Sequence, residues 1–165
     1  MPNRSRPPGK PETIDSEMTE DRPACRRRAM DLLARREHSR LELERKLVAK
    51  SFDESLVSDV LDELEEDGLL SAERFAQSFV ASRYARGQGP YRIRRDLGER
   101  GIESAEAYLD DERFDWGALA RATRVKRFGN EVPADFKEKA RQMRFLEYRG
   151  FDRGQIKRAL ELEDE

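Results

Sequence analysis

The sequence contains very little of the chemistry on which disulfides, metal sites and proton transfer depend. Cys25 is the single cysteine and His38 the single histidine among 165 residues. One cysteine excludes an internal disulfide and a cysteine zinc cluster, and one histidine leaves little for metal binding or acid–base work. No apolar run approaches the length of a membrane span, and no signal peptide is visible. We therefore expect a soluble protein of the reducing cytoplasm with no metal site.

Motifs for nucleotide chemistry are also absent. Neither GxxxxGK[ST] nor a GxGxxG that opens a helix after a strand occurs in the sequence. The segment RGQGP, from Arg86 to Pro90, has two glycines, but no strand precedes it and no lysine follows it in the phosphate-binding pattern. The many carboxylates between residues 53 and 67 are typical of a solvated helix surface. We expect neither an enzyme nor a cofactor.

Charged residues are abundant, and their sign alternates along the chain. They make up 41% of the sequence against 36% hydrophobic residues, a balance that suits small helical units with thin cores. Three basic blocks are each followed by an acidic block: 22–50 and 51–68, 69–101 and 102–116, 117–150 and 151–165. A charge run alone indicates a solvated face, but alternation in step with a structural period indicates a repeated unit.

A six-residue pattern recurs at nearly equal spacing. The pattern L-x-x-[KR]-[GS]-[FI] begins at Leu47, Leu97 and Leu146, and LARREHSR upstream of the first copy aligns with residues 83–91 upstream of the second. An internal period near fifty residues indicates tandem structural repeats. Ser51 stands where the other two copies have glycine, so we expect the first copy to close its helix least well.

The stretch from Arg83 to Ile102 is the centre of this organisation. Two glycines end one helix, and Pro90 suits the first turn of the next because its missing N–H is not needed there. Gly101 can adopt the left-handed conformation that closes a helix in a Schellman motif. In that motif Leu97 and Ile102 occupy the two positions that touch.

Apolar residues at helical spacing predict nine helices, and no segment shows the alternation of a strand. The first helix is expected from about Pro23 to Glu37 and a short sixth helix from Glu103 to Asp110. The residues expected to open the others are Ser39, Asp53, Ser71, Pro90, Asp115, Asp135 and Asp152. We expect Phe136 on a buried face, and Leu69 packed back onto Leu64.

The helices group into an all-α fold of three tandem three-helix, helix-turn-helix-like repeats. The expected repeats are residues 22–68, 69–114 and 115–165. Residues 1–21 are rich in proline and polar residues and lack apolar periodicity, so we expect a disordered N-terminal tail there.

Five segments together closely resemble the RecX family. They are LARREHSR-x-EL-x-x-KL (33–47), DGLL-x-x-x-RFA (67–76), SR-x-x-RGQGP-x-RI-x-x-DL-x-x-RGI (82–102), DW (115–116) and FLEYRGF (145–151). The resemblance runs from about residue 24 to the end, and the combination is specific although each phrase alone is weak. Ser51 and the short sixth helix depart from the pattern, which bears on local geometry.

Members of this family regulate the bacterial recombinase RecA. The resemblance implies an elongated, curved module that docks in the groove of the RecA–DNA filament. It also implies inhibition of ATP hydrolysis, coprotease activity and strand exchange by RecA, and so a role in recombinational DNA repair and the SOS response. It implies no cofactor. We expect a monomer whose direct contact with DNA is weak and nonspecific.

The candidate contact residues are basic or polar and lie around the central turn or at related places in the other repeats. They are Arg83, Arg86, Gln88, Arg92, Arg94, Arg95, Arg100, Arg36, Arg40, Arg144 and Arg149. Arg92, Arg94 and Arg95 crowd one helical turn, so we expect an external anion to relieve their repulsion. The alternative for each residue is an ordinary surface arginine.

Two other functions stay open. Three-helix units with short turns, and the phrase LDELEEDGLLSAERF (61–75), resemble helix-turn-helix and winged-helix DNA readers, which favours a transcription regulator. Against this reading, residues 51–68 hold eight acids and no base, whereas a DNA-reading helix must face phosphates, and no β-hairpin wing is predicted. A structural scaffold with no dependence on nucleic acid is the third possibility.

Overall fold

The structure is a computed structural model that describes residues 14–161, with side chains from Asp21 onward, and the only regular elements in that part are α-helices. Their bounds are α1 Ile14–Leu33, α2 Arg40–Val48, α3 Glu54–Glu66, α4 Ala72–Ala85, α5 Pro90–Gly98, α6 Glu106–Leu109, α7 Trp116–Phe128, α8 Phe136–Arg149 and α9 Arg153–Ala159. The expectation of an all-α fold is confirmed. None of the described helices combines the length and apolar composition that crossing a membrane requires.

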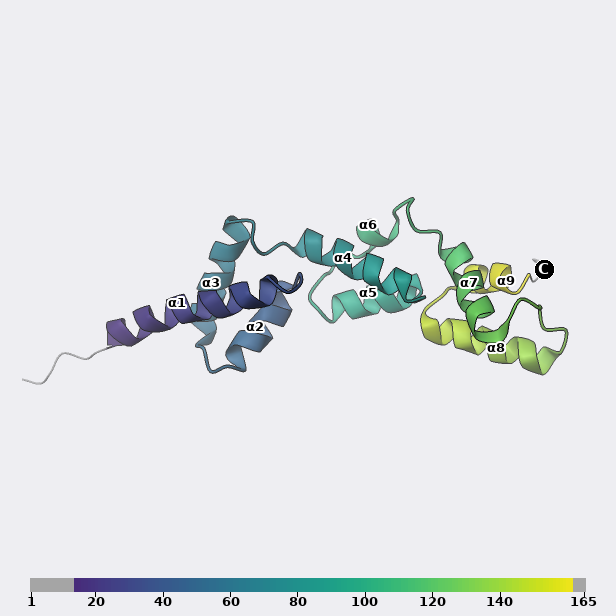
Figure 1. Cartoon of the computed structure of the whole chain (residues 1–165), viewed down its shortest axis with the longest axis horizontal. Coiled ribbons are helices and arrows are strands. Elements are labelled where there is room, and N and C mark those ends of the chain that lie inside the picture. Colours follow the sequence, from purple (N-terminus) through teal and green to yellow (C-terminus); the bar gives the residue numbers. More distant parts are fainter. Residues whose placement is uncertain (1–13, 162–165) are drawn as a thin grey trace, which may run out of the picture.

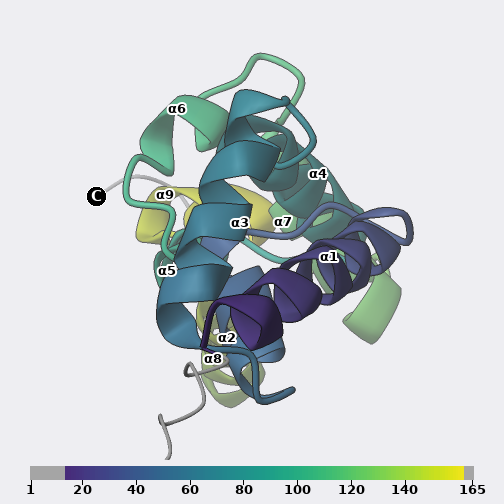
Figure 2. The same ribbon diagram turned by 90° about the vertical axis from the view of Figure 1, so that its left-hand side faces the viewer.

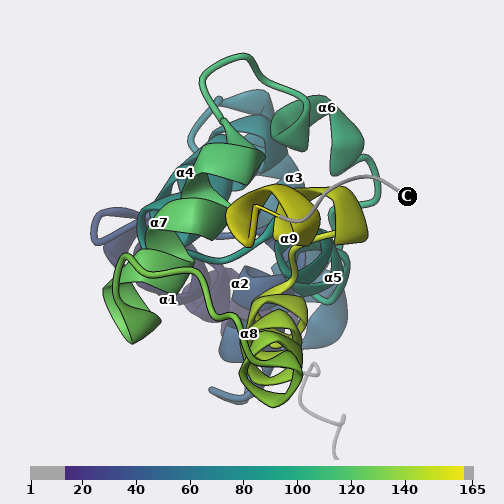
Figure 3. The same cartoon turned by 90° about the vertical axis from the view of Figure 1, so that its right-hand side faces the viewer.

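The helices form three groups, each with its own hydrophobic core. One core joins α1–α3, the second joins α4–α6, and the third joins α7–α9. Figure 1 shows the three groups in a row along the longest axis. Figure 2 looks onto the first group, where α1 lies across α3, and Figure 3 looks from the other end onto α7, α8 and α9. We call the groups the first, second and third repeat.

The cores extend slightly beyond the ranges expected from the sequence. Leu70 is buried in the first core, although the second repeat was expected to begin at residue 69. Trp116 packs against the second core, where its ring lies near those of Tyr84 and Phe114. The linker after α3 and the first residue of α7 therefore contribute apolar side chains to the preceding repeat.

The first helix begins earlier than expected. α1 starts at Ile14 and continues through Pro23, so the helix extends into the segment expected as a disordered tail, and residues 1–13 of that segment lie outside the described part. The helix was expected to begin at about Pro23, a residue that has no N–H to donate to the carbonyl four residues earlier. In the structure Pro23 lies inside the helix instead.

The three copies of the six-residue pattern close their helices in the same way. In the second copy Gly101 has φ +82°, its N–H donates to the carbonyl of Gly98 (3.0 Å), and the N–H of Ile102 donates to that of Leu97 (3.0 Å). This is the expected Schellman motif. The third copy repeats it at Gly150, where the N–H of Phe151 donates to the carbonyl of Leu146 over 3.2 Å.

The first copy forms the same motif with a non-glycine residue. Ser51 has φ +68°, and the N–H of Phe52 reaches the carbonyl of Leu47 over 3.4 Å, the longest of the three corresponding bonds. A left-handed conformation costs an L-residue about 1–2 kcal/mol, whereas glycine adopts it freely.

We therefore expect Ser51→Gly to raise the free energy of unfolding by about 0.5–1 kcal/mol, since the greater freedom of glycine in the unfolded chain offsets part of the relief. Urea unfolding of both proteins measures the difference. A lower midpoint for Ser51→Gly would show that the serine is not strained.

Two side chains differ from their expected places, and a third residue is buried without having been singled out. Leu69 makes the expected backbone bond to the carbonyl of Leu64 (2.9 Å) but is 39% exposed, and Leu70 is the side chain that enters the core. The expectation of a buried Phe136 is wrong, because this residue begins α8 and is 84% exposed. Conversely, Arg124 is fully buried on α7 and donates to the carbonyls of Asn130 and Glu131, which holds the α7–α8 loop.

The second and third repeats meet through their main chains. The N–H of Gly89 donates to the carbonyl of Arg149 (2.7 Å), and that of Tyr91 donates to the carbonyl of Gly150 (3.0 Å). A Cβ atom on Gly89 would lie 2.3 Å from the Gly150 carbonyl carbon, and one on Gly150 would lie 2.4 Å from the Cβ of Arg92. Glycine is needed at both positions because no side-chain atom fits between the two backbones.

Candidate functional site

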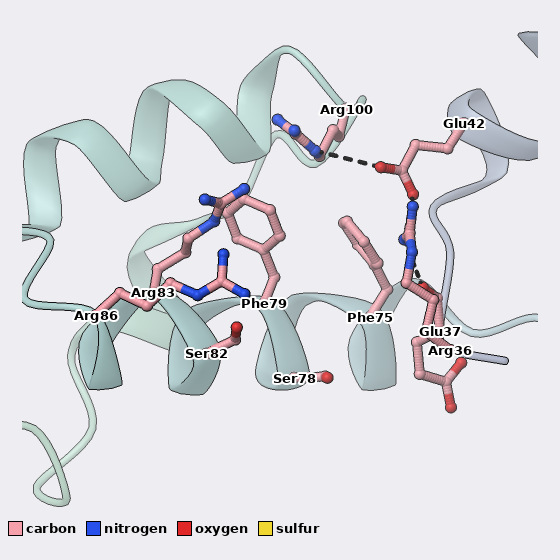
Figure 4. A pocket seen from close by; sticks show the side chains of 10 residues that line it. All are labelled: Arg36, Glu37, Glu42, Phe75, Ser78, Phe79, Ser82, Arg83, Arg86 and Arg100. Carbon is pink, nitrogen blue, oxygen red and sulfur yellow. Dashed lines mark hydrogen bonds and ion pairs between the residues drawn. The ribbon is translucent and has the colours of Figure 1, made fainter.

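A hollow of about 280 Å³ opens between the first and second repeats, and four arginines line it. We call it the junction pocket. Its lining residues come from the α1–α2 loop, α2, α4 and the end of α5: Arg36, Glu37, Glu42, Phe75, Ser78, Phe79, Ser82, Arg83, Arg86 and Arg100 (Figure 4). Four of the eleven expected contact residues, Arg36, Arg83, Arg86 and Arg100, therefore come together here.

Carboxylates neutralise only part of this positive charge. Glu42 pairs with Arg36 (Nη1 to Oε2, 3.1 Å) and with Arg100 (Nε to Oε1, 3.3 Å), which draws the two repeats together. Glu37 instead pairs with Arg74 outside the pocket (2.9 Å). Within the described part of the chain, the guanidinium groups of Arg83 and Arg86 form no ion pair.

An aromatic ring positions two of the guanidinium groups. The Cζ atoms of Arg83 and Arg100 lie 4.7 and 4.9 Å from the ring centroid of Phe79. These distances are within the range of cation–π attraction, which contributes about 0.5–1 kcal/mol at exposed sites and more where the groups are desolvated. In Figure 4 the side chains of Arg83 and Arg86 extend along α4 toward this ring, above Ser82.

The electrostatics of the pocket reflect this crowding. Burial lowers the pKa of Arg83, and the nearby charges of Arg100, Arg86 and Arg92 lower it further, while Asp96 opposes them. Burial works against ionisation of Glu42, but the hydrogen bond and charge of Arg36 outweigh it and lower the pKa of Glu42. The four arginines of the lining outnumber its two carboxylates, Glu37 and Glu42, so the pocket carries a net positive charge.

A buried histidine supports the loop that carries Arg36. His38 is 2% exposed; its Nε2 lies 3.0 Å from the Lys46 ammonium, and its Nδ1 lies 3.0 Å from the carbonyl oxygen of Arg36. Lysine can only donate, so Nε2 accepts and Nδ1 carries the proton that is donated to Arg36. Neutral His38 therefore fixes the backbone beside the junction pocket.

We expect the protein to lose stability in mild acid because of His38. Burial lowers the pKa of His38 from its ordinary value of 6.5, despite the hydrogen bond to Arg36. Below about pH 6.5 the unfolded chain then binds a proton at His38 that the folded chain excludes. The contribution of neutral His38 to the free energy of unfolding is therefore complete above about pH 6.5 and is lost as the pH falls toward the folded-state pKa. Urea unfolding from pH 7.5 to 5 measures the loss, and His38→Gln should flatten that pH dependence. Identical profiles for both proteins would refute this role.

A second basic hollow, of about 340 Å³, lies between the second and third repeats. Four cations line it, from α4, α7 and α8: Arg86, Lys126, Arg127 and Arg149. The Arg149 guanidinium donates to the carbonyl of Arg86 (3.2 Å). Because Arg86 lines both hollows, basic side chains extend from the first repeat to the third. The sequence did not single out Lys126 and Arg127, although both end a basic helix.

Other expected contact residues are held at the junction between the second and third repeats. Gln88 is 8% exposed and its Oε1 has no hydrogen-bond partner. The Arg92 guanidinium lies 5.5 Å from the Tyr148 ring, and its Nε is buried without a partner. Arg92 therefore packs against the third repeat, and Gln88 is buried one position before Gly89.

The remaining expected residues lie apart from the pocket. Arg94 pairs with Glu106 (2.9 Å), and Arg95 lies near Asp96 (3.4 Å) and Glu99 (3.9 Å). Carboxylates of the same repeat thus lie beside two of the three crowded α5 arginines. Arg40 and Arg144 lie outside both hollows.

The charge alternation also has a structural role within the first repeat. Arg40 pairs with Asp62 (2.7 Å) and Glu65 (2.9 Å) on α3, and Arg26 pairs with Asp67 (2.8 Å). Basic α1 and α2 therefore pack against acidic α3, and part of the opposite charge is used internally. Exposed pairs of this kind contribute about 0–1 kcal/mol each.

Helices stacked as three-helix repeats, with basic hollows at their junctions, define a tandem-repeat binding protein. The described residues contain no cluster of potential metal ligands. Models of the first, second and third three-helix domains of RecX match residues 25–64, 73–107 and 117–160, respectively. The chain belongs to the RecX family.

Two relatives and two crystal structures show the extent of the similarity. The chain is 48% identical over 144 residues to the regulatory protein RecX of Halorhodospira halophila, covering 86% of this chain and 89% of that protein. It is 46% identical over 139 residues to that of Ectopseudomonas mendocina, covering 83% and 93%.

The fold matches crystal structures at lower sequence identity. RecX from Lactobacillus salivarius has a TM-score of 0.71 at 19% identity, covering 87% of this chain and 96% of that chain. A second structure, of a regulatory protein RecX, has a TM-score of 0.74 at 20% identity, covering 88% and 73%. These two structures support the arrangement of three helical repeats.

Proposed function

We propose that this protein is a non-enzymatic regulator of the recombinase RecA. It binds the RecA–DNA filament as a cytoplasmic monomer without a cofactor, and it inhibits ATP hydrolysis, strand exchange and coprotease activity by RecA. Through this inhibition the protein modulates recombinational DNA repair and the SOS response. Membership of the RecX family and the names of the relatives support this proposal.

The observation that carries the proposal is the position of the basic hollows. They lie at successive junctions of an elongated row of repeats, and Arg86 belongs to both. A nucleoprotein filament is itself a repeating surface of protein and DNA phosphate. Contacts made by several repeats add through effective concentration, so modest individual sites suffice. The candidate contacts are Arg36, Arg83, Arg86, Arg100 and Arg149.

The proposed mechanism is steric and mechanical. A module bound along the filament groove blocks access of a second DNA strand and hinders the movement between RecA subunits that ATP turnover requires. Main-chain hydrogen bonds between the second and third repeats stiffen the module against that movement.

DNA-dependent ATP hydrolysis by RecA tests the proposal. Adding the protein to preformed filaments should lower the hydrolysis rate in a dose-dependent manner, with saturation below one molecule per RecA subunit because the module is elongated. An unchanged rate, under conditions in which the protein demonstrably binds the filament, would contradict the inhibitory function.

The alternative of a sequence-specific transcription regulator is less well supported. Its candidate reading helix, α3, contains no basic residue for DNA phosphates, and its Asp62, Glu63 and Glu65 pair with arginines of the same repeat. The structure also shows no β-hairpin wing among the described residues.

A further inference from the structure

The junction pocket has the composition of an anion site rather than that of a general basic surface. It draws cations from two repeats: Arg36 from the first, and Arg83, Arg86 and Arg100 from the second. Ser78 and Ser82 add hydroxyl groups. Its volume of about 280 Å³ is close to the lower end of ligand pockets, about 300 Å³.

We propose that the junction pocket is a binding site for a single phosphate group held by both repeats. The proposal deepens the function proposed above, since in a nucleoprotein filament the phosphate would belong to the DNA backbone. Free phosphate or pyrophosphate has the same recognition chemistry.

The arrangement of donors favours phosphate over a protein carboxylate. Glu42 already supplies a carboxylate, which engages Arg36 and Arg100 and leaves Arg83 and Arg86 without an ionic partner. Guanidinium groups form forked, charge-assisted hydrogen bonds with phosphate oxygens. A tetrahedral phosphate offers acceptors in several directions, so it can meet arginines from two sides and a serine hydroxyl together.

The pocket is also partly organised before a ligand arrives. The ring of Phe79 restrains the guanidinium groups of Arg83 and Arg100, and buried His38 holds the backbone carbonyl of Arg36. Side chains that are already ordered lose less conformational entropy on binding. This distinguishes Arg83 and Arg100 from freely exposed arginines.

Glu42 acts as an internal competitor for the phosphate. Its carboxylate occupies two of the four arginines, and it also completes the capping box of α2 by accepting from the N–H of Ser39. Glutamine preserves a capping box but removes the negative charge. Glu42→Gln therefore separates the electrostatic role of this residue from its structural one.

Calorimetric titration of the full-length protein at fixed low ionic strength tests the proposal, with pyrophosphate and a five-residue oligothymidylate as probes. The Arg83→Gln/Arg86→Gln variant should bind both probes at least tenfold more weakly than the wild type, and Glu42→Gln should bind both several-fold more tightly. Arg35→Gln removes an exposed arginine adjacent to Arg36 but outside the pocket, and it should bind like the wild type. Circular dichroism confirms that each variant is folded.

The outcomes separate the sources of the phosphate and the two proposals. Stronger pocket-dependent binding of the oligothymidylate assigns the site to DNA backbone, and stronger binding of pyrophosphate assigns it to free phosphate. Equal binding by all variants, or an equal loss in Arg35→Gln, overturns the site even if the protein still inhibits RecA. If the protein binds phosphate through the pocket but does not bind the RecA filament, the phosphate site is supported and the proposed function is contradicted.

Discussion

Replacing Gly89 with alanine is expected to separate the third repeat from the second. The added Cβ would lie 2.3 Å from the carbonyl carbon of Gly150 and 2.4 Å from the backbone nitrogen of Phe151. Overpacking costs about 1–3 kcal/mol when side chains can shift, and here both neighbours are backbone, so we expect a cost near or above the upper end. The hydrogen bond from Gly89 to Arg149 (2.7 Å) would be lost as the repeats move apart.

Urea unfolding and small-angle X-ray scattering measure the separation. We expect a lower unfolding midpoint and a larger radius of gyration, while circular dichroism still shows helices. Gly98→Ala is the matched control, because this glycine lies in α5 with no atom within 4 Å of an added Cβ. It should be neutral or stabilising by up to about 1 kcal/mol. Equal behaviour of the two variants would show that Gly89 does not join the repeats.

Replacing Arg83 and Arg86 together with glutamine should weaken inhibition of RecA by about tenfold to a hundredfold. Both guanidinium groups lack a carboxylate partner within the described residues and face the junction pocket. A hydrogen bond to a charged group contributes about 1.5–3 kcal/mol, and a tenfold to hundredfold loss corresponds to about 1.4–2.8 kcal/mol, so the expected range equals the loss of about one such bond. The measurement is the concentration of protein that halves DNA-dependent ATP hydrolysis.

The matched control for this variant removes two arginines whose charges are already balanced. Arg94 and Arg95 lie near Glu106 and Glu99, respectively, so Arg94→Gln/Arg95→Gln should inhibit nearly as well as the wild type. Arg92 is left unchanged because it packs near Tyr148 at the next junction. Equal potency of the Arg83/Arg86 variant and the wild type would contradict a role of the junction pocket in inhibition.

Local sequence signals predicted the helix ends well. The closure at Gly101 depends on residues within one turn, and the capping boxes of Ser39 and Asp152 depend on residues three positions away. Such features need no knowledge of the rest of the fold, so sequence alone predicts them. Ser51 was predicted to be the poorest closure by comparison with the other two copies.

Features set by contacts between distant segments were not predictable in the same way. Glycine at position 89 was interpreted as a helix breaker, whereas its closest neighbour is the backbone of Gly150. The crowded arginines of α5 suggested an external anion because no carboxylate partner for Arg94 was evident from the sequence. In the structure Glu106, twelve positions further along the chain, lies 2.9 Å from Arg94. Phe136 was expected to be buried from helical spacing alone, but at the start of α8 it is 84% exposed.

The candidate site was predicted in composition but not in shape. Arginines around the central turn were singled out, yet their gathering with Arg36 requires the first repeat to lie against the end of α5. The link is the ion pair between Arg100 and Glu42 (3.3 Å). Residues 42 and 100 belong to different repeats, and no local pattern relates them.

The most direct test of the central claim is a titration of fluorescently labelled protein against bare DNA, RecA alone and the RecA–ATP–DNA filament over a salt series. We predict strong binding to the filament, weak nonspecific binding to DNA alone, and a loss of affinity with salt that is shallower for Arg83→Gln/Arg86→Gln, since fewer phosphates are neutralised. Tight, sequence-selective binding to bare duplex DNA would favour a transcription regulator, and equal binding with and without nucleic acid would favour a scaffold. Either result would contradict a regulator that recognises the assembled filament.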